Sequence, residues 1–175
     1  ILVSNCCISK SNRGISIQIR DCGNVENVIF SNIRIETRRF SYEWWGRAEA
    51  ICLTALDRKP GVKAGKIRNV RFQNITCEGE NGIFILGSPD NHIEDVTFDN
   101  ISMVLDKKSK WEIEGYDKRP CQGDGNIKTK ISGIYVDEAE DITFRNVKIA
   151  KREGILPYYK EDVTLGNVER VMVEK

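Results

Sequence analysis

The stretch NVENVIFSNIRI, residues 24–35, decides the fold because the chain repeats it. The repeated pattern is a short apolar run followed by a fixed Asn and a second apolar pair. Full copies are KIRNVRFQNITC at 66–77, HIEDVTFDNISM at 92–103 and EAEDITFRNVKI at 138–149; a partial copy, ILVSNCCI, lies at 1–8, and a degraded one, DVTLGNVE, at 162–169. Self-similarity of this kind predicts a repeat architecture in which each unit packs on its neighbours.

The spacing of the fixed Asn measures the repeat. The series is Asn5, Asn32, Asn74, Asn100, Asn146 and, less clearly, Asn167, with gaps of 27, 42, 26, 46 and 21 residues. Two of these gaps indicate a period near 26. The two longest gaps therefore contain insertions, which we place at residues 36–49 and 105–130.

A second repeated element lies between the Asn-containing segments. Its copies are GISIQI at 14–19, AICLTA at 50–55, GIFILG at 82–87 and GIYVDE at 133–138. Each alternates apolar and other residues with period two, which predicts strands. The residues expected to point inward are Ile15, Ile17, Ile51, Leu53, Ile83, Ile85, Ile134 and Val136. In the first repeated element, the Asn-containing segment, the alternation breaks at the Asn, where we expect a bend.

These features predict an all-β protein, a right-handed parallel β-helix (solenoid) of about six to seven coils. Residues 1–175 form one domain. Parallel stacking would place equivalent residues in columns, so the Asn side chains should form a hydrogen-bonded ladder beside columns of Val, Ile and Phe. No segment shows a helical period over eleven residues. Because the sequence opens inside a repeat, we expect the remainder of the same β-helix on its N-terminal side.

Composition excludes several function classes. Lys and Arg total 27 against 26 Asp and Glu, and no basic stripe indicates a nucleic-acid partner. No run approaches the roughly 18 apolar residues of a membrane span, so no membrane partner is expected. The six cysteines have no CxxC pair or metal-like spacing. They favour buried free thiols over a disulfide framework, and we predict no metal and no cofactor.

The insertion at 36–49, ETRRFSYEWWGRAE, holds the most informative side chains. Adjacent tryptophans in a loop cannot both point into one core, so at least one of Trp44 and Trp45 should present an indole face outward. Indole faces suit the apolar faces of sugar rings, and guanidinium groups suit uronate carboxylates. The insertion therefore forms either the wall of a binding groove or a structural cover over a sheet. Candidate ligand-binding residues here are Arg38, Trp44, Trp45, Arg47 and Glu49.

The remaining polar features have plainer interpretations. The insertion at 105–130 forms either a second groove wall or a flexible surface loop. Outward positions of the second element (Ser16, Cys52, Phe84 and Tyr135) stack aromatic groups on one sheet face. That face should be covered or bind a ligand, which makes Tyr135 a further candidate. His92 and the acidic run at 137–141 are expected in turns.

The sequence resembles a known family. The tandem N-V-x-F-x-N-I coils alternating with G-I-x-I strands resemble the C-terminal half of polygalacturonase-type β-helix enzymes, glycoside hydrolase family 28. The segment NRGISIQIRDCGNVENVIFSNIRIET, followed by WWGRAEAICLTA, is especially similar to uncharacterised bacterial members. The resemblance implies inverting hydrolysis of glycosidic bonds by two carboxylates about 6.5–9.5 Å apart.

The resemblance places the catalytic residues outside this sequence. The family's Asp-Asp and Gly-His-Gly motifs do not occur in it and are expected to precede residue 1, so no catalytic residue is predicted here. The position of the family's Arg-Ile-Lys motif falls on Ser16-Ile17-Gln18. Arg13 or Arg20 would have to replace its substrate clamp, and this disfavours unsubstituted galacturonan.

The sequence thus predicts the C-terminal segment of a pectin- or polysaccharide-degrading glycoside hydrolase, extracellular or periplasmic, which is inactive as an isolated segment. Its partner would be a polysaccharide or oligosaccharide that can contain uronate units. The alternative is a non-catalytic β-helix that binds polysaccharide or serves as a structural spine. A polysaccharide lyase has less support, because no calcium-binding acidic cluster accompanies a basic residue.

Overall fold

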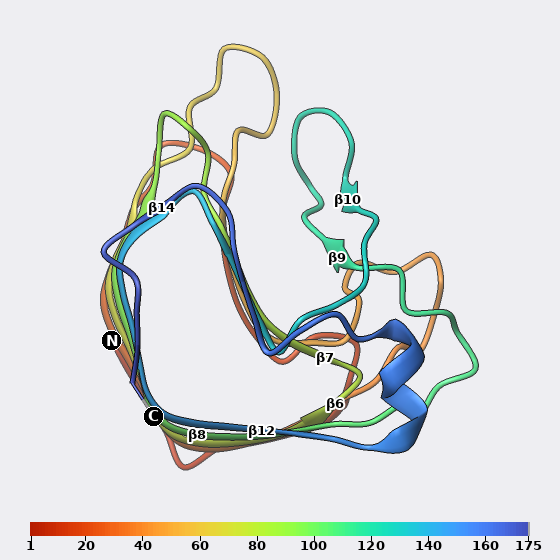
Figure 1. The fold of residues 1–175 in the computed structure, drawn as a ribbon. Coiled ribbons are helices and arrows are strands. Elements are labelled where there is room, and N and C mark those ends of the chain that lie inside the picture. The colour runs from red at the N-terminus through yellow and green to blue at the C-terminus, as the bar shows by residue number, and fades with distance from the viewer. Residues whose placement is uncertain (175) are drawn as a thin grey trace.

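The computed structural model describes residues 1–174 and is built mainly of parallel β-strands (Figure 1). The larger sheet has the order β1-β4-β6-β8-β12-β14, with β2 paired to β4 and β15 paired to β12. Its strands are β1 (Leu2–Ser4), β2 (Cys7–Ser11), β4 (Val25–Thr37), β6 (Ile67–Gly79), β8 (Ile93–Leu105), β12 (Ala139–Lys151), β14 (Val168–Glu169) and β15 (Met172–Glu174).

A second parallel sheet has the order β13-β11-β7-β5-β3. Its strands are β3 (Ile15–Ile19), β5 (Glu49–Ala55), β7 (Asn81–Leu86), β11 (Ile134–Asp137) and β13 (Val163–Leu165). Two short strands, β9 (Tyr116–Asp117) and β10 (Asn126–Ile127), pair antiparallel outside both sheets. A 3₁₀ helix, η1 (Glu153–Tyr158), follows β12 and is the one helix among the described residues.

Strand register follows the sequence repeat. Val28 pairs with Val70 and Val70 with Val96, so equivalent residues form columns. The aromatic column is equally regular, with the Phe72 and Phe98 rings stacked at 4.7 Å between centroids. Figure 1 shows the consequence, because β6, β8 and β12 follow nearly the same path in projection.

The predicted Asn ladder is confirmed. The Asn74 amide donates to Asn32 Oδ1 at 3.2 Å, and the Asn100 amide donates to Asn74 Oδ1 at 2.8 Å. The ladder continues at both ends, where the Asn32 amide donates to Asn5 Oδ1 and the Asn146 amide donates to Asn100 Oδ1. All five ladder residues have φ between 47° and 57°. This left-handed conformation, which Asn tolerates better than most residues, makes the predicted bend.

The assignment of Asn167 to this ladder is wrong. Its amide donates instead to Glu138 Oε2 at 2.9 Å. The stretch at 162–169 begins with β13, which pairs with β11 of the second sheet. The final copy of the first element lies later, in β14 and β15, where Met172 pairs with Thr143. The apolar pattern was too degraded to place it from sequence.

A second corner of left-handed residues precedes each ladder Asn from Asn32 onward by five positions. It consists of Asn27, Asn69, Asp95 and Asp141, all with φ between 50° and 58°. Asn69 donates to Asn27, whereas Asp95 and Asp141 pair with Arg71 and Arg170. No sequence repeat marks this corner, because the residue type changes from amide to carboxylate along the column.

Two apolar clusters hold the molecule together. The first lies inside, between the sheets, and contains every residue predicted to point inward from the second element. The second lies on the outer face of the second sheet, where Phe84, Leu86 and Cys52 are buried under Ile113 and Tyr116 of the 105–130 insertion. The Phe84 and Tyr116 rings stack at 4.7 Å. The outward aromatic column is therefore covered, and the flexible-loop interpretation of that insertion is wrong for its packed part.

The cysteines only partly follow expectation. Cys52 and Cys77 are buried thiols, and burial raises the pKa of each to about 12. Cys6, Cys7 and Cys22 are exposed, and no disulfide joins cysteines in residues 1–174. Cys6 occupies the repeat position that Ile33 occupies after Asn32, which is an apolar position. It is nevertheless exposed, because it lies at the edge of the larger sheet among the described residues.

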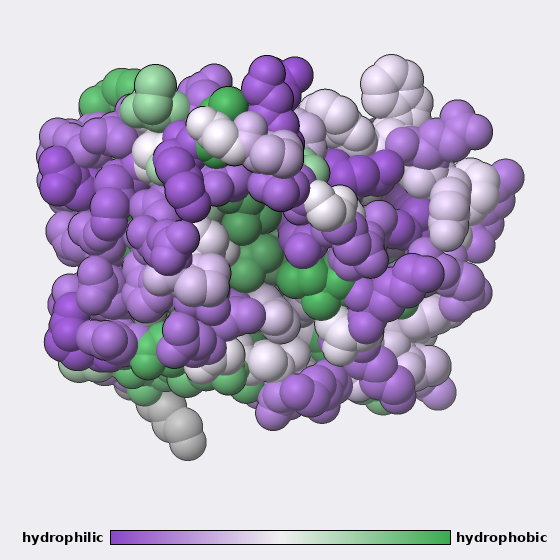
Figure 2. All heavy atoms as spheres, turned by 90° about the horizontal axis from the view of Figure 1, so that it is seen from above, coloured by the Kyte–Doolittle hydropathy of each residue, from purple (hydrophilic) through white to green (hydrophobic). Residues whose placement is uncertain are grey.

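Outside the clusters the surface is predominantly hydrophilic. Seen from above, apolar side chains lie at the bottom of a central hollow with hydrophilic residues around it (Figure 2). The described chain contains no helix that is long and apolar enough to cross a membrane.

Candidate functional site: the tryptophan loop

The loop between β4 and β5, residues 38–48 (the tryptophan loop), presents two adjacent indoles. The Trp44 side chain is 74% exposed and the Trp45 side chain 54% exposed. Together with Glu43 they line an open hollow of about 500 Å³. The prediction that at least one indole faces outward is confirmed, and neither belongs to an apolar cluster.

Polar side chains from distant parts of the chain fix the backbone of this loop. Asn12 accepts a hydrogen bond from the Phe40 N–H at 2.8 Å and donates to the Trp45 carbonyl at 2.9 Å. Asp117 Oδ2 accepts from the Gly46 N–H at 2.6 Å. Gly46 has φ +103°, a conformation open to glycine, so the chain can turn sharply after Trp45.

Glu49 is fully buried and links the tryptophan loop to β9. Its Oε2 accepts from Arg13 Nε at 3.1 Å and from the Arg47 N–H at 2.8 Å. Its Oε1 accepts from the Asp117 N–H at 2.9 Å, and Arg13 Nη2 donates to the Asp117 carbonyl at 2.7 Å. Burial acts to lower the pKa of Arg13, but the nearby Glu49 carboxylate, with a smaller contribution from Asp117, raises it overall. Arg13 and Glu49 thus form a charged internal support.

Asp117 is another buried carboxylate. Arg119 binds it through both oxygens, with Nε to Oδ1 at 2.9 Å and Nη2 to Oδ2 at 2.8 Å. Burial alone would raise the pKa of Asp117, but the hydrogen bonds from Arg119 and from the Gly46 N–H lower it below its ordinary value. The same pair raises the pKa of Arg119.

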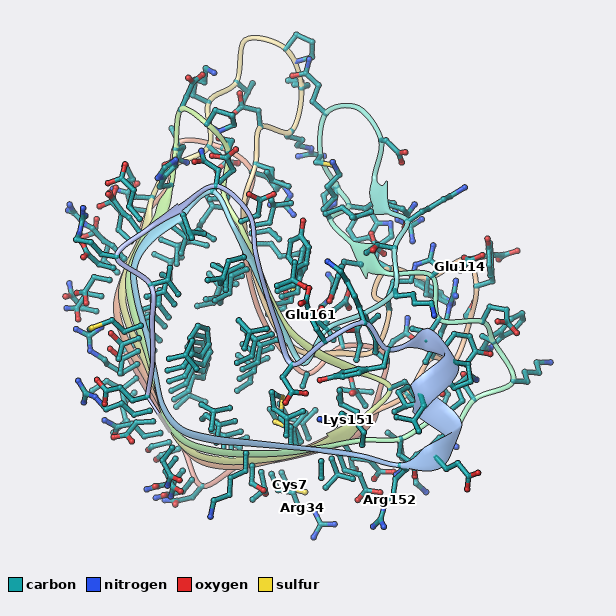
Figure 3. The ribbon with its side chains drawn as sticks, in the orientation of Figure 1. Cys7, Arg34, Glu114, Lys151, Arg152 and Glu161 are labelled. Carbon is teal, nitrogen blue, oxygen red and sulfur yellow. The ribbon has the colours of Figure 1, made fainter. Side chains whose placement is uncertain are left out.

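Arg47 and Arg39 pack under Tyr42 on the outer side of the loop. Arg47 Nη1 lies 3.1 Å from Glu114 Oε2, which also accepts from the Tyr42 hydroxyl at 3.3 Å. Arg39 Nη1 donates to the Glu112 carbonyl at 2.7 Å, and its guanidinium lies 4.5 Å from the Tyr42 ring centroid. Figure 3 labels Glu114 where the two insertions meet.

The seven candidate residues therefore do not form one site. Trp44 and Trp45 share the exposed hollow, while Arg13, Arg47 and Glu49 lie beneath it as support. The Arg38 guanidinium lies 4.2 Å from the Phe40 ring centroid. Tyr135 belongs to the second apolar cluster, 4.8 Å from the Tyr116 ring, and burial raises its pKa.

Other expected residues have structural positions. Arg20 donates to the carbonyls of Ile19, Thr54 and Lys118, so it is engaged inside the molecule like Arg13. His92 Nε2 lies 3.2 Å from Glu138 Oε2 at a turn, as predicted. No group of three or more metal-ligating side chains is found in residues 1–174.

Sequence reasoning missed Asn12, Glu114 and Asp117, which hold the tryptophan loop in place. None of them occupies a repeat position. Their partners lie up to 104 residues away, as in the bond from Arg13 to Asp117. The acidic residues of the 105–130 insertion were a signal, but nothing in the sequence assigned their partners.

Comparison of the chain with protein-family models, with curated proteins and with solved structures gave no match. The chemistry of the site therefore follows from its own residues. Two indole faces and one carboxylate surround an open hollow, and a network of buried ion pairs holds their backbone. This arrangement suits binding of a ring with an apolar face and polar edges.

Proposed function

We propose that the chain is a right-handed parallel β-helix of six layers. Both sheets add parallel strands in chain order, and the chain passes alternately between the two sheets from β3 to β8 and again from β11 to β14. Such a path is a continuous coil. Parallel crossover connections are almost always right-handed, which supports that hand here.

We further propose that the chain binds a polysaccharide through Trp44 and Trp45. The observation that carries this proposal is the exposure of two adjacent indoles on a loop anchored by buried polar groups. Sugar rings present C–H groups on one face and hydroxyl groups at the edge. An indole face offers the C–H face of a sugar ring a large contact area at low conformational cost.

The wider role that we propose is carbohydrate degradation. On the resemblance to glycoside hydrolase family 28, the chain would serve an extracellular or periplasmic enzyme of the polygalacturonase type. The binding surface, and not the pair of catalytic carboxylates, is assigned to this chain, because the family's catalytic motifs do not occur in the sequence.

A non-catalytic binding module is the second candidate. It is favoured by the covered outer face of the second sheet, where Tyr116 and Ile113 bury the aromatic column. A reducing-end assay with the chain alone on polygalacturonan and rhamnogalacturonan should detect no release. Measurable release would show that catalytic residues lie within residues 1–175 and would contradict the assignment.

Intrinsic fluorescence offers a direct binding test, because the chain has three tryptophans. A Trp111→Phe background leaves the Trp44 and Trp45 pair as reporters. Titration with pectic and neutral oligosaccharides should shift its emission. Because each aromatic contact contributes about 1 kcal/mol, Trp44→Ala or Trp45→Ala should weaken affinity several-fold, measured by calorimetry.

Leu156→Ala is the matched control, since it removes an exposed apolar side chain from η1. It should leave affinity unchanged. If both tryptophan variants bind as well as the parent chain but melt at lower temperature, the loop is a structural cover and the binding proposal fails.

A further inference from the structure

We propose that the tryptophan hollow selects sugar units without a carboxylate and disfavours uronates. This inference rests on the proposed polysaccharide binding alone, independently of the proposed polygalacturonase-type enzyme, and specifies the ligand class of the hollow. It differs from the uronate recognition that the arginine-rich loop sequence suggested, and the difference comes from where the charges lie.

The guanidinium groups under the loop are already occupied. Arg13 is paired with Glu49, Arg47 with Glu114 and Arg119 with Asp117. The Arg119 pair uses both carboxylate oxygens, so the fork of donors that would hold a uronate is filled. A uronate could bind there only by displacing a buried internal carboxylate.

The fourth guanidinium is also engaged. Arg39 donates to the carbonyls of Glu112, Ser41 and Tyr42, and its side chain is buried. Burial, followed by the nearby charge of Arg47, lowers its pKa. It therefore stabilises the turn of the loop and does not offer donors to a ligand on the outside.

Glu43 gives the hollow its charge. It is the charged residue among the three that line the hollow, and its side chain is exposed. No ion pair of Glu43 is found in the part of the chain that the structure describes. An unpaired carboxylate accepts hydrogen bonds from sugar hydroxyl or ammonium groups, whereas it repels a uronate.

Arg38 is the remaining cation of the insertion, and it lies elsewhere. Its backbone N–H donates to the Ser11 carbonyl, and its guanidinium lies over Phe40. It does not line the hollow with Glu43, Trp44 and Trp45. Arg38 therefore provides a control that changes the charge of the same loop outside the proposed contact.

The test uses ligand pairs that differ in charge. Oligogalacturonate is compared with its full methyl ester, and an oligoglucuronate with its carboxyl-reduced product, by fluorescence titration in the Trp111→Phe background. At low ionic strength the uncharged member should bind about three- to tenfold tighter, as expected for one pair of like charges a few ångströms apart at a surface. Added salt should reduce this ratio.

Charge variants then identify the cause. Glu43→Gln should raise affinity for the charged member and bring the ratio toward one, while Arg38→Ala should leave the ratio unchanged. Equal or tighter uronate binding by the parent chain, or a ratio insensitive to Glu43→Gln, would overturn the inference but leave polysaccharide binding intact. If none of the four ligands binds, the proposed function fails with it.

Discussion

At the scale of single residues, Asp117 connects two insertions that the repeat pattern leaves separate. It accepts from the Gly46 N–H directly after Trp45, and Arg119 clamps it from the other side. Arg119 Nη2 also donates to the Trp44 carbonyl at 3.4 Å. This buried carboxylate therefore contributes, together with Asn12, to the position of both indoles.

Asp117→Asn should lower the free energy of unfolding at pH 7 by about 1–3 kcal/mol, because it weakens buried charge-assisted hydrogen bonds. Since the folded pKa of Asp117 is depressed, its stabilisation is present above the ordinary value of 3.8 and is lost as pH falls below it. Urea titrations at pH 7, 5 and 3 should show the gap between parent and variant narrowing in acid.

Acrylamide quenching adds a readout specific to positioning. In the Trp111→Phe background, Asp117→Asn should make Trp44 and Trp45 more accessible to quencher at pH 7, whether or not a ligand binds. Asp124→Asn, in the same insertion, is the control and should leave quenching unchanged. A destabilised Asp117→Asn chain with parent-like quenching would limit Asp117 to a role in stability.

At the scale of elements, the Asn ladder holds the bends of five layers in register. Asn74 lies in its middle, donating to Asn32 and accepting from Asn100. It combines two contributions: the amide bonds along the column and tolerance of the left-handed backbone. These contributions can be separated by substitution.

Asn74→Gly keeps the backbone conformation and loses the amide bonds, whereas Asn74→Ala loses both. We expect a cost of about 1–2 kcal/mol for Asn74→Gly and about 1 kcal/mol more for Asn74→Ala, from denaturant unfolding. Asn146, at the end of the ladder, donates to Asn100. Its Gly variant should cost less than that of Asn74, and equal costs would contradict a continuous ladder.

The elements also show what the sequence could predict. Parallel strands, the ladder and the inward Ile and Leu residues were predictable, because each depends on a pattern repeated several times. The packing of the 105–130 insertion was not, since Tyr116 and Ile113 contact Phe84 and Leu86 without any repeat to align them. For the same reason the indoles were identified as candidates, whereas their supports Asn12 and Asp117 were not.

At the scale of the whole molecule, the contacts are of two kinds. Neighbouring layers are joined by strands one repeat apart, such as β6 and β8. The tryptophan loop is instead joined to the rest by side chains from three distant segments: Asn12, Glu80 and Asp117. Layers can therefore form independently of the loop, but the loop cannot be fixed before the layers on either side of it.

We expect this difference to appear in refolding. Far-ultraviolet circular dichroism, which reports the strands, should recover before the quencher protection of Trp44 and Trp45 in the Trp111→Phe background. Closing long chain segments slows folding. Simultaneous recovery of both signals in stopped-flow measurements would contradict this order.

The 104-residue separation between Arg13 and Asp117 thus has a consequence in time as well as in space. During synthesis from the ribosome, the first layers emerge long before Asp117 does. Until then Arg13 and Glu49 lack their hydrogen bonds to the Asp117 backbone. The Gly46 N–H, directly after the indoles, also lacks the Asp117 carboxylate that accepts from it. The binding surface lies in the first third of the chain, yet it is completed only after two thirds of the chain has been made.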